Sequence, residues 1–199
     1  GYAMNKVFIV HGFEGSPNGG WRPWLMRELE KKDIYACALS MPSPENPVCA
    51  EWVKEIARHI KGNPSTSSGD KIFLVGHSLG APAILRYLES KHAKKIEGAI
   101  LVSGPCEPLK HLKIKNFLNS PFNWKAIQSK AKSFIIIHGD NDRVVPLKEA
   151  KILSEKLNSV NWFELGFVCD GRYLFSQKSL ENSLLPDYFR EDIYKTQLF

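Results

Sequence analysis

The sequence predicts an α/β fold, a three-layer α/β/α sandwich in which helices cover both faces of a mostly parallel, six-stranded sheet. Short apolar runs of strand length alternate with segments of helical period along most of the 199 residues. This alternation is typical of βαβ units joined by right-handed crossovers. The runs at residues 96–102 and 133–137 are apolar enough to be strands covered on both faces. A chain of this length with 43% hydrophobic residues can form one domain with a sizeable core.

The first part of the chain predicts three strands and two helices. An apolar run predicts a strand at 6–10, which a glycine-rich loop at 12–20 follows. A helix at 21–32 then places four apolar side chains on one face: Trp21, Trp24, Leu25 and Leu29. A short strand at 34–38 and a proline-rich loop at 41–47 come next. Residues 51–60 carry apolar residues at helical spacing, and the polar turn at 62–70 precedes a third strand at 71–75.

The second part of the chain continues the alternation. A helix at 79–90 buries Ile84, Leu85 and Leu88, and the fourth strand follows at 96–102. Residues 103–132 contain proline, lysine and aromatic residues without clean periodicity, so we expect a short cap over the substrate site there. A strand at 133–137, a helix at 148–157 and a sixth strand at 160–165 complete the pattern. Beyond residue 166 no periodic pattern is visible.

The turn between the third strand and the next helix carries a candidate nucleophile. Gly76-His77-Ser78-Leu79-Gly80 matches G-x-S-x-G, with a strand before it and a helix after it. Glycines at both ends allow a sharp turn that exposes the Ser78 hydroxyl. An ester carbonyl attacked by this hydroxyl becomes an oxyanion, which needs hydrogen-bond donors already in place. We expect the backbone amides of Leu79 and of Phe13, in the loop that begins His11-Gly12, to supply them.

Four features in order along the chain resemble one family. His11-Gly12, the Trp21 and Trp24 pair, residues 76–80 and residues 139–146 (GDNDRVVP) look like a small α/β-hydrolase with a minimal cap, similar to the retinoblastoma-binding-protein-like serine hydrolases. The resemblance covers residues 4–165 and implies the strand order 2-1-3-4-5-6. It also implies that Asp142 is the catalytic acid, with Asp140 as the alternative. The resemblance implies supporting roles for His11, Gly12, Gly76, His77 and Gly80.

The catalytic base is the point where the resemblance fails. The family places a histidine after the last strand, in a Gly-His-Phe context, whereas this chain reads Gly166-Phe167 there. Its histidines, at 11, 59, 77, 92, 111 and 138, all precede Asp142. His11, His77 and His138 are more easily explained as structural residues than as replacements, and the other three as surface residues. We expect one domain over residues 1–199, with residues 1–3 left from expression and residues 166–199 atypical of the family.

The charge and composition of the chain limit the kinds of partner that we expect it to bind. The net charge is +6, but lysines and glutamates alternate, as in the segment 28–32, which favours a solvated mixed surface over a nucleic-acid site. Lys110, Lys113 and Lys115 beside the cap are compatible with an anionic substrate, although a solvated lysine face is the simpler interpretation. No apolar run approaches the ~18 residues of a membrane span. The four cysteines have no metal-type spacing and suit a cytoplasmic protein with free thiols.

Together these observations predict a cytoplasmic serine hydrolase of the carboxylesterase type. Ser78 would attack a small acyl ester and form an acyl-serine intermediate, without a metal or an organic cofactor. No nucleic-acid or membrane partner is expected, and the sequence leaves the oligomeric state open. The missing histidine supports a second hypothesis, a catalytically weak or inactive hydrolase fold that serves as a binding protein.

Overall fold

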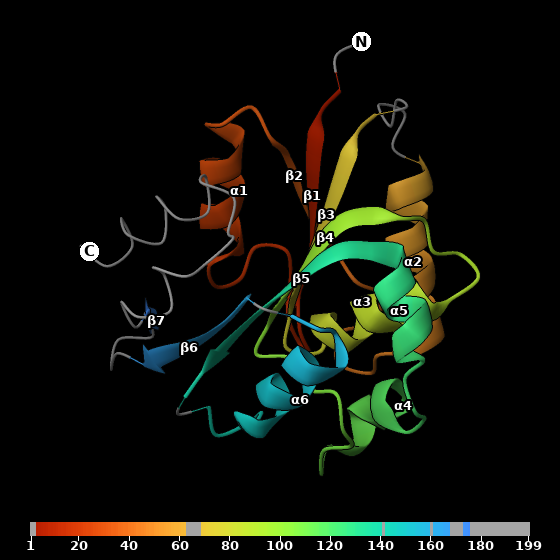
Figure 1. Ribbon diagram of the computed structural model, residues 1–199, viewed down its shortest axis with the longest axis vertical. Helices are drawn as coiled ribbons and strands as arrows, with labels where there is room; N and C mark the ends of the chain where they lie inside the picture. Colours follow the sequence, from red (N-terminus) through yellow and green to blue (C-terminus); the bar gives the residue numbers. More distant parts are fainter. Residues whose placement is uncertain (1–2, 63–68, 141, 160, 168–172, 176–199) are drawn as a thin grey trace.

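Seven strands form one sheet in the computed structural model, which describes residues 3–62, 69–140, 142–159, 161–167 and 173–175. The spatial order is β2-β1-β3-β4-β5-β6-β7. The first six strands pair in parallel: β1 (Asn5–Val10), β2 (Tyr35–Leu39), β3 (Lys71–His77), β4 (Ile96–Val102), β5 (Ala131–Gly139) and β6 (Asn161–Phe167). Their carboxyl ends face the lower part of Figure 1. The predicted order 2-1-3-4-5-6 is confirmed.

The predicted count of six strands needs a correction. A seventh strand, β7 (Tyr173–Phe175), pairs antiparallel with β6 at the edge of the sheet. Three residues are too short to show a period of two in the sequence, and β7 lies where no periodicity is visible. The segment 166–199 was expected to be atypical of the family. Of this segment, residues 168–172 and 176–199 lie outside the described residues.

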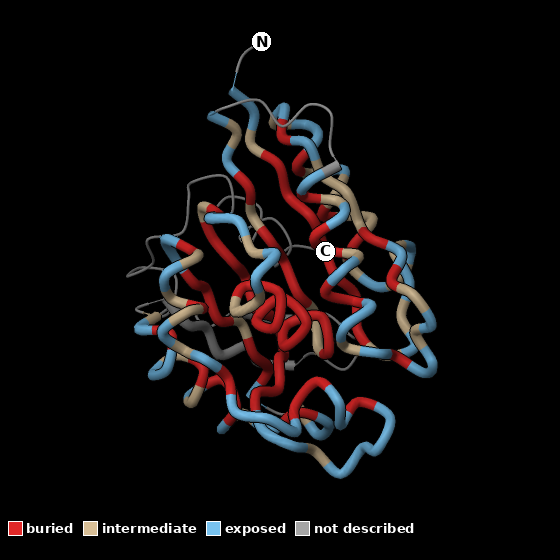
Figure 2. Tube along the Cα trace, turned by 90° about the vertical axis from the view of Figure 1, so that its right-hand side faces the viewer, coloured by how far each residue is buried: buried red, intermediate tan, exposed pale blue. Residues whose placement is uncertain are grey.

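Helices cover both faces of the sheet, as predicted. The helix α1 (Arg22–Glu30) packs on one face, where Leu25 and Leu29 join apolar residues of β1, β3, β4 and β5. On the other face lie α2 (Cys49–Gly62), α3 (Gly80–Glu89), α4 (Lys115–Leu118), α5 (Trp124–Lys130) and α6 (Lys148–Lys156). Figure 2 shows the buried strands and α3 at the centre, with exposed segments around them. The four predicted helices therefore all exist, each within a few residues of its expected bounds.

The expected cap lies between β4 and β5. It contains a single turn of 3-10 helix, η1 (Leu112–Ile114), followed by the short helices α4 and α5. Elements of three to seven residues are too short to display helical periodicity, which explains why the sequence pattern there is irregular.

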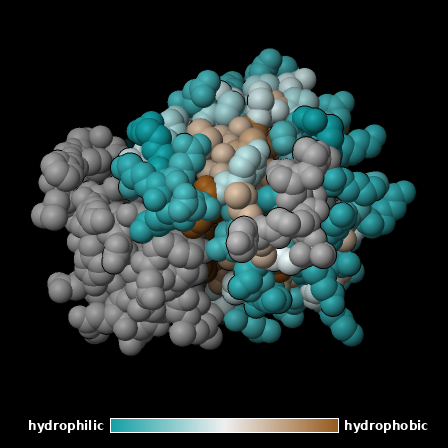
Figure 3. Space-filling model, turned by 90° about the horizontal axis from the view of Figure 1, so that it is seen from above, coloured by the Kyte–Doolittle hydropathy of each residue, from teal (hydrophilic) through white to brown (hydrophobic). Residues whose placement is uncertain are grey.

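The opposite end of the sheet is formed by the amino ends of the strands. Its described surface is mainly hydrophilic, with a narrow apolar strip in the middle (Figure 3). No helix in the described part of the chain combines the length and the apolar character needed to cross a bilayer.

Candidate active site

Ser78 occupies a strained turn at the carboxyl end of β3. Its φ is +52°, in the left-handed region that a residue with a side chain rarely adopts. The turn is held on both sides, because the Ser78 amide donates to the Val102 carbonyl at 2.8 Å and the Ser78 carbonyl accepts from Ala81 at 3.0 Å. A Cβ on Gly76 would lie 2.7 Å from the backbone of Gly80, so the crossing of strand and helix requires glycine there. The G-x-S-x-G segment thus forms the predicted sharp turn.

The loop after β1 lies directly beside Ser78. A Cβ on Gly12 would be 3.1 Å from Ser78 Cβ and 3.6 Å from its Oγ. This closeness follows from the parallel pairing of β1 and β3, in which Val10 is opposite Gly76. A Cβ on Gly80 would collide with the carbonyl oxygen of Val10, so glycines on both strand-to-helix connections let the two loops approach.

The two amides expected to stabilise an oxyanion are both available. Neither the Phe13 N–H nor the Leu79 N–H has an acceptor among the described residues. Their neighbours are bonded, since the Glu14 amide donates to the Pro44 carbonyl at 2.9 Å and the Ser78 amide donates to Val102. Leu79 is also the N-terminal cap residue of α3, where the helix dipole favours negative charge. The fold therefore leaves two unused donors on the loops that flank Ser78.

His11 orders the loop that carries Phe13. Its ring Nδ1 lies 2.8 Å from the Gly12 carbonyl oxygen, and its Nε2 accepts the Met41 amide at 3.1 Å. These bonds define the tautomer, with the proton on Nδ1, and occupy both ring nitrogens. Burial is the main cause that lowers the pKa of His11. His11 is thus a neutral brace and has no free nitrogen to serve Ser78.

His77, the residue before Ser78, packs with α1. Its ring meets that of Trp21 edge to face, with centroids 5.6 Å apart, and Arg22 Nη1 lies 3.5 Å from its Nδ1. Burial, followed by the positive charge of Arg22, lowers the pKa of His77 to about 4. Arg22 is itself 5% exposed and donates from Nε to the Ser16 carbonyl at 2.8 Å. Arg22 therefore ties the glycine-rich loop to the end of β3, next to the turn that carries Ser78.

Asp142 lies on the loop after β5, where the family motif predicts an acid. Its Oδ1 accepts the amides of Val144 and Val145, both at 2.9 Å, and so shapes the loop. Its Oδ2 is 3.8 Å from Nε2 of His138, a fully buried ring whose Nε2 donates to the Val145 carbonyl at 2.8 Å. His138 thus fixes the Asp142 loop from the sheet side. Asp140, the alternative acid, is exposed.

No imidazole activates Ser78 in this structure. All six histidines are among the described residues, and Ser78 Oγ has no hydrogen-bond partner in that part of the chain. His59 is bonded to Glu55 on α2, and His92 is exposed after α3. His111 is exposed on the cap, but its ring contacts the Phe13 ring with centroids 4.5 Å apart. His111 therefore contacts the loop of Phe13 from the cap, and it is exposed, as the sequence predicts.

Two buried arginines are structural residues that the sequence patterns did not single out. Arg22 is described above, and Arg86 holds the cap from the middle of α3. A charged residue inside the apolar run 83–88 was the available signal for Arg86, because a buried charge needs partners. In the described residues, no group of three or more His, Cys, Asp or Glu is arranged to hold a metal ion.

Comparisons with known proteins agree with this arrangement. Residues 7–165 match the family model described as serine hydrolase. A Bacillus subtilis protein named as a hydrolase, YdeN, is 32% identical over 156 residues, covering 77% of this chain and 80% of that protein. The serine hydrolase RBBP9 of Rattus norvegicus is 25% identical over 159 residues, covering 77% of this chain and 81% of its own.

Solved structures show the same fold. The crystal structure of the B. subtilis ydeN gene product superposes with a TM-score of 0.74 at 27% identity, covering 98% of this chain and 100% of that one. Est1E from Butyrivibrio proteoclasticus, solved with ferulic acid bound, gives a TM-score of 0.67 at 14% identity, covering 98% of this chain and 89% of that one. At that identity the second likeness concerns the fold alone.

Proposed function

Because this chain belongs to the serine hydrolase family, we propose that it is a carboxylesterase-type enzyme that cleaves a small acyl ester through an acyl intermediate on Ser78. The observation that carries the proposal is the combination of a strained Ser78 with two unbonded amides beside it. If the segment 76–80 served only to start a helix, this would not explain why amide N–H groups on two different loops are left without acceptors. This combination suits a group that becomes negatively charged at the position of attack.

The proposed reaction has two steps. Ser78 Oγ loses its proton and bonds to the carbonyl carbon, while the amides of Phe13 and Leu79 stabilise the resulting oxyanion. The intermediate collapses, the ester C–O bond breaks, and the alcohol leaves with a proton. Water then attacks the acyl-serine and releases the carboxylic acid, which restores Ser78. Asp142 stands at the family position of the acid that orients a base.

The absence of an imidazole partner sets the expected rate. With no such partner among the described residues, the proposed mechanism assigns the Ser78 proton to water. Oxyanion stabilisation and binding alone typically accelerate such reactions by ~10³ to 10⁴ over water. We therefore expect a slow esterase.

Labelling with a fluorophosphonate probe tests the nucleophile. The wild type should be labelled slowly and Ser78→Ala not at all, while Ser103→Ala, which removes a buried hydroxyl at the end of β4, should react like the wild type. Hydrolysis of p-nitrophenyl butyrate should follow the same order. Labelling that persists in Ser78→Ala would contradict the assignment of Ser78.

The same missing partner favours a second candidate, a binding protein that keeps the hydrolase fold without turnover. The two candidates differ in one measurement. A binding protein would leave p-nitrophenyl butyrate unhydrolysed above the rate of Ser78→Ala, whereas the esterase must exceed it.

A further inference from the structure

The positive charge of the chain is concentrated in one segment. Residues 108–139 contain six lysines and no Asp, Glu or Arg: Lys110, Lys113, Lys115, Lys125, Lys130 and Lys132. The rest of the chain is therefore neutral on balance, because the net charge of the whole is +6. This segment is the cap together with β5. The alternation of lysine and glutamate seen elsewhere does not extend to it.

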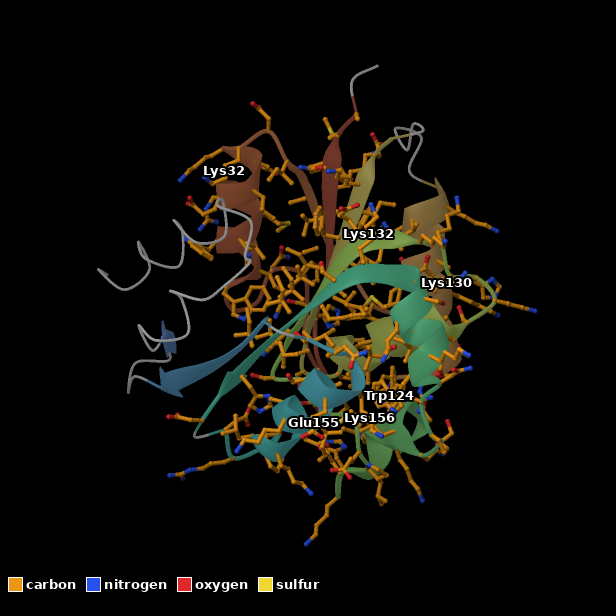
Figure 4. All side chains as sticks on the ribbon, viewed as in Figure 1. Lys32, Trp124, Lys130, Lys132, Glu155 and Lys156 are labelled. Atoms are coloured by element: carbon orange, nitrogen blue, oxygen red, sulfur yellow. The ribbon has the colours of Figure 1, made fainter. Side chains whose placement is uncertain are left out.

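Three of these lysines lie at the carboxyl edge of the sheet, where Ser78 is. Lys110, Lys113 and Lys115 are exposed and form no ion pair with the described residues. Lys130, the last residue of α5, and Lys132, in β5, lie away from Trp124 (Figure 4), and Lys132 is paired with Glu97 at 3.0 Å. Of the six lysines, Lys110, Lys113 and Lys115 lie closest in sequence to His111, whose ring contacts that of Phe13.

The cap that presents these lysines is firmly anchored. Asn116 donates to the Pro47 carbonyl at 3.0 Å and accepts the Cys49 amide at 2.6 Å, which joins α4 to the start of α2. Arg86 donates to the carbonyls of Phe117 and Ser120 at 2.9 and 2.6 Å. The lysines therefore project from a fixed backbone, so their charge is held at the edge of the site.

None of the carboxylates in the described part of the chain forms an ion pair with Lys110, Lys113 or Lys115. Glu107 pairs with Lys148 at 3.5 Å, and buried Glu149 accepts the amides of Cys106 and Glu107. Asp142 is bonded to its own loop. Glu14 follows Phe13 directly, and its amide donates to the Pro44 carbonyl. A substrate that reaches Ser78 past the cap therefore meets positive charge on that side.

We infer that the lysine face of Lys110, Lys113 and Lys115 recognises an anionic group on the substrate, so that the preferred ester carries a carboxylate or phosphate. This inference rests on the proposed function and adds the class of substrate. Fixed charges of one sign beside a site raise the association rate of opposite charges by ~10 to 10³, and salt screens the effect.

Two esters of matched length test the inference. We expect p-nitrophenyl hemisuccinate, which is anionic, to exceed neutral p-nitrophenyl butyrate by about 10-fold in kcat/KM at low salt. The triple variant Lys110→Gln, Lys113→Gln, Lys115→Gln should remove this preference and leave the butyrate value unchanged. The matched control replaces Lys91, Lys94 and Lys95, which are exposed at the opposite edge of the sheet, and should retain the preference. Equal values for the two esters at low salt, or an unchanged preference in the cap variant, would overturn the inference.

Binding separates this inference from the proposed function. Ser78→Ala cannot form the acyl intermediate, so calorimetry with monomethyl succinate and methyl butyrate measures recognition alone. Selective binding of the anionic ester, lost with the three cap lysines, would support the inference even if the wild type hydrolyses nothing.

Leu112, 83% exposed between these lysines, makes a lipid surface the competing explanation. Sedimentation with phosphatidylglycerol vesicles tests it. Vesicle binding that depends on the three lysines, with no selectivity between the soluble esters, would refute the inference.

Discussion

At the residue scale, Gly12 and Gly80 are both required beside Ser78, but for different reasons. A Cβ on Gly80 would meet the backbone of β1, which cannot move without disturbing the sheet. A Cβ on Gly12 would meet the side chain of Ser78 at 3.1 Å, a contact that small shifts can relieve. Gly80 therefore serves mainly the packing of α3 on the sheet, and Gly12 leaves space around the Ser78 side chain.

This difference predicts that Gly80→Ala mainly lowers stability, whereas Gly12→Ala mainly slows the reaction of Ser78. We expect Gly80→Ala to lower the free energy of unfolding by about 3 kcal/mol, because overpacking against a fixed backbone is costly. We expect Gly12→Ala to cost about 1 kcal/mol but to slow fluorophosphonate labelling of Ser78 at least 10-fold. Urea unfolding and labelling kinetics measure the two effects. Equal losses of stability in the two variants would show that Gly12 is also a packing residue.

His77 predicts a dependence of stability on pH. Its pKa is about 4 in the folded protein against 6.5 as the ordinary value. Between these values the unfolded chain binds a proton that the folded chain does not, so the free energy of unfolding should fall as the pH decreases from 6.5 to 4. The loss is about 3 kcal/mol, and stability above pH 6.5 should be constant with respect to this group. Burial lowers the pKa of His11 as well and acts in the same direction.

Urea titrations between pH 4 and 7 measure this loss. His77→Asn keeps an acceptor for Arg22 but cannot be protonated, so its stability should depend less on pH in this range. An unchanged pH dependence in His77→Asn would assign the effect to other groups.

The sequence could predict the sharp turn at Ser78 and Leu79, because G-x-S-x-G stands between an apolar run and a helical pattern. It could not predict the roles of Arg22 or His138, since each depends on a partner brought close only by the tertiary fold. Arg22 meets His77 across 55 residues of chain. His138 binds the Val145 carbonyl, and only the conformation of the loop after β5 brings these two groups together.

At the element scale, the cap depends on one side chain of α3. Arg86 is 8% exposed and donates to three cap carbonyls, at Phe117, Ser120 and Pro121. It also pairs with Glu89 at 2.7 Å, and its guanidinium lies 3.7 Å from the centre of the Phe122 ring. Glu89 in turn accepts the Asn123 amide at 2.7 Å. A single arginine–glutamate pair therefore bonds three carbonyls and one amide of the backbone in residues 117–123.

Removal of Arg86 should loosen the cap. We expect Arg86→Met to lower the free energy of unfolding by about 3 kcal/mol, because Glu89 and several carbonyls lose a buried partner. Limited proteolysis should then cut within residues 111–124 faster than in the wild type. The matched control is Arg58→Met, whose exposed pair with Glu55 is screened by solvent and should contribute little to stability. Equal protease resistance of Arg86→Met and the wild type would show that apolar packing alone holds the cap.

The long elements could be predicted from the sequence, and the short ones could not. The strand β4 has the predicted bounds, because six of its seven residues are apolar or small and only Glu97 carries a charge. The helices α4 and α5 and the strand β7 were not predicted. They contain four, seven and three residues, and their conformations depend on contacts such as those of Arg86 and on pairing with β6.

At the scale of the whole molecule, the parallel sheet gathers three loops from distant parts of the chain. The loops after β1, β3 and β5 carry Phe13, Ser78 and Asp142, and all leave the same edge of the sheet. The next strand, β6, ends at that edge too, since Leu165 is opposite Gly139 and the strand continues to Phe167. Position 167 therefore lies at the edge beside the loop of Asp142, where the family carries its histidine.

This position predicts a gain of activity. We expect Phe167→His to raise the rate of p-nitrophenyl butyrate hydrolysis at least 10-fold, because a general base typically contributes ~10² to 10⁴. The rise should require both a nucleophile and an acid, so Phe167→His combined with Ser78→Ala or with Asp142→Asn should lose it. Its pH profile should show a new ionisation near the ordinary pKa of histidine, ~6.5. Phe167→Gln, which cannot act as a base, is the control. If Phe167→His folds with wild-type stability yet remains as slow as Phe167→Gln, the edge at β6 does not place a base beside Ser78, and the binding function gains support.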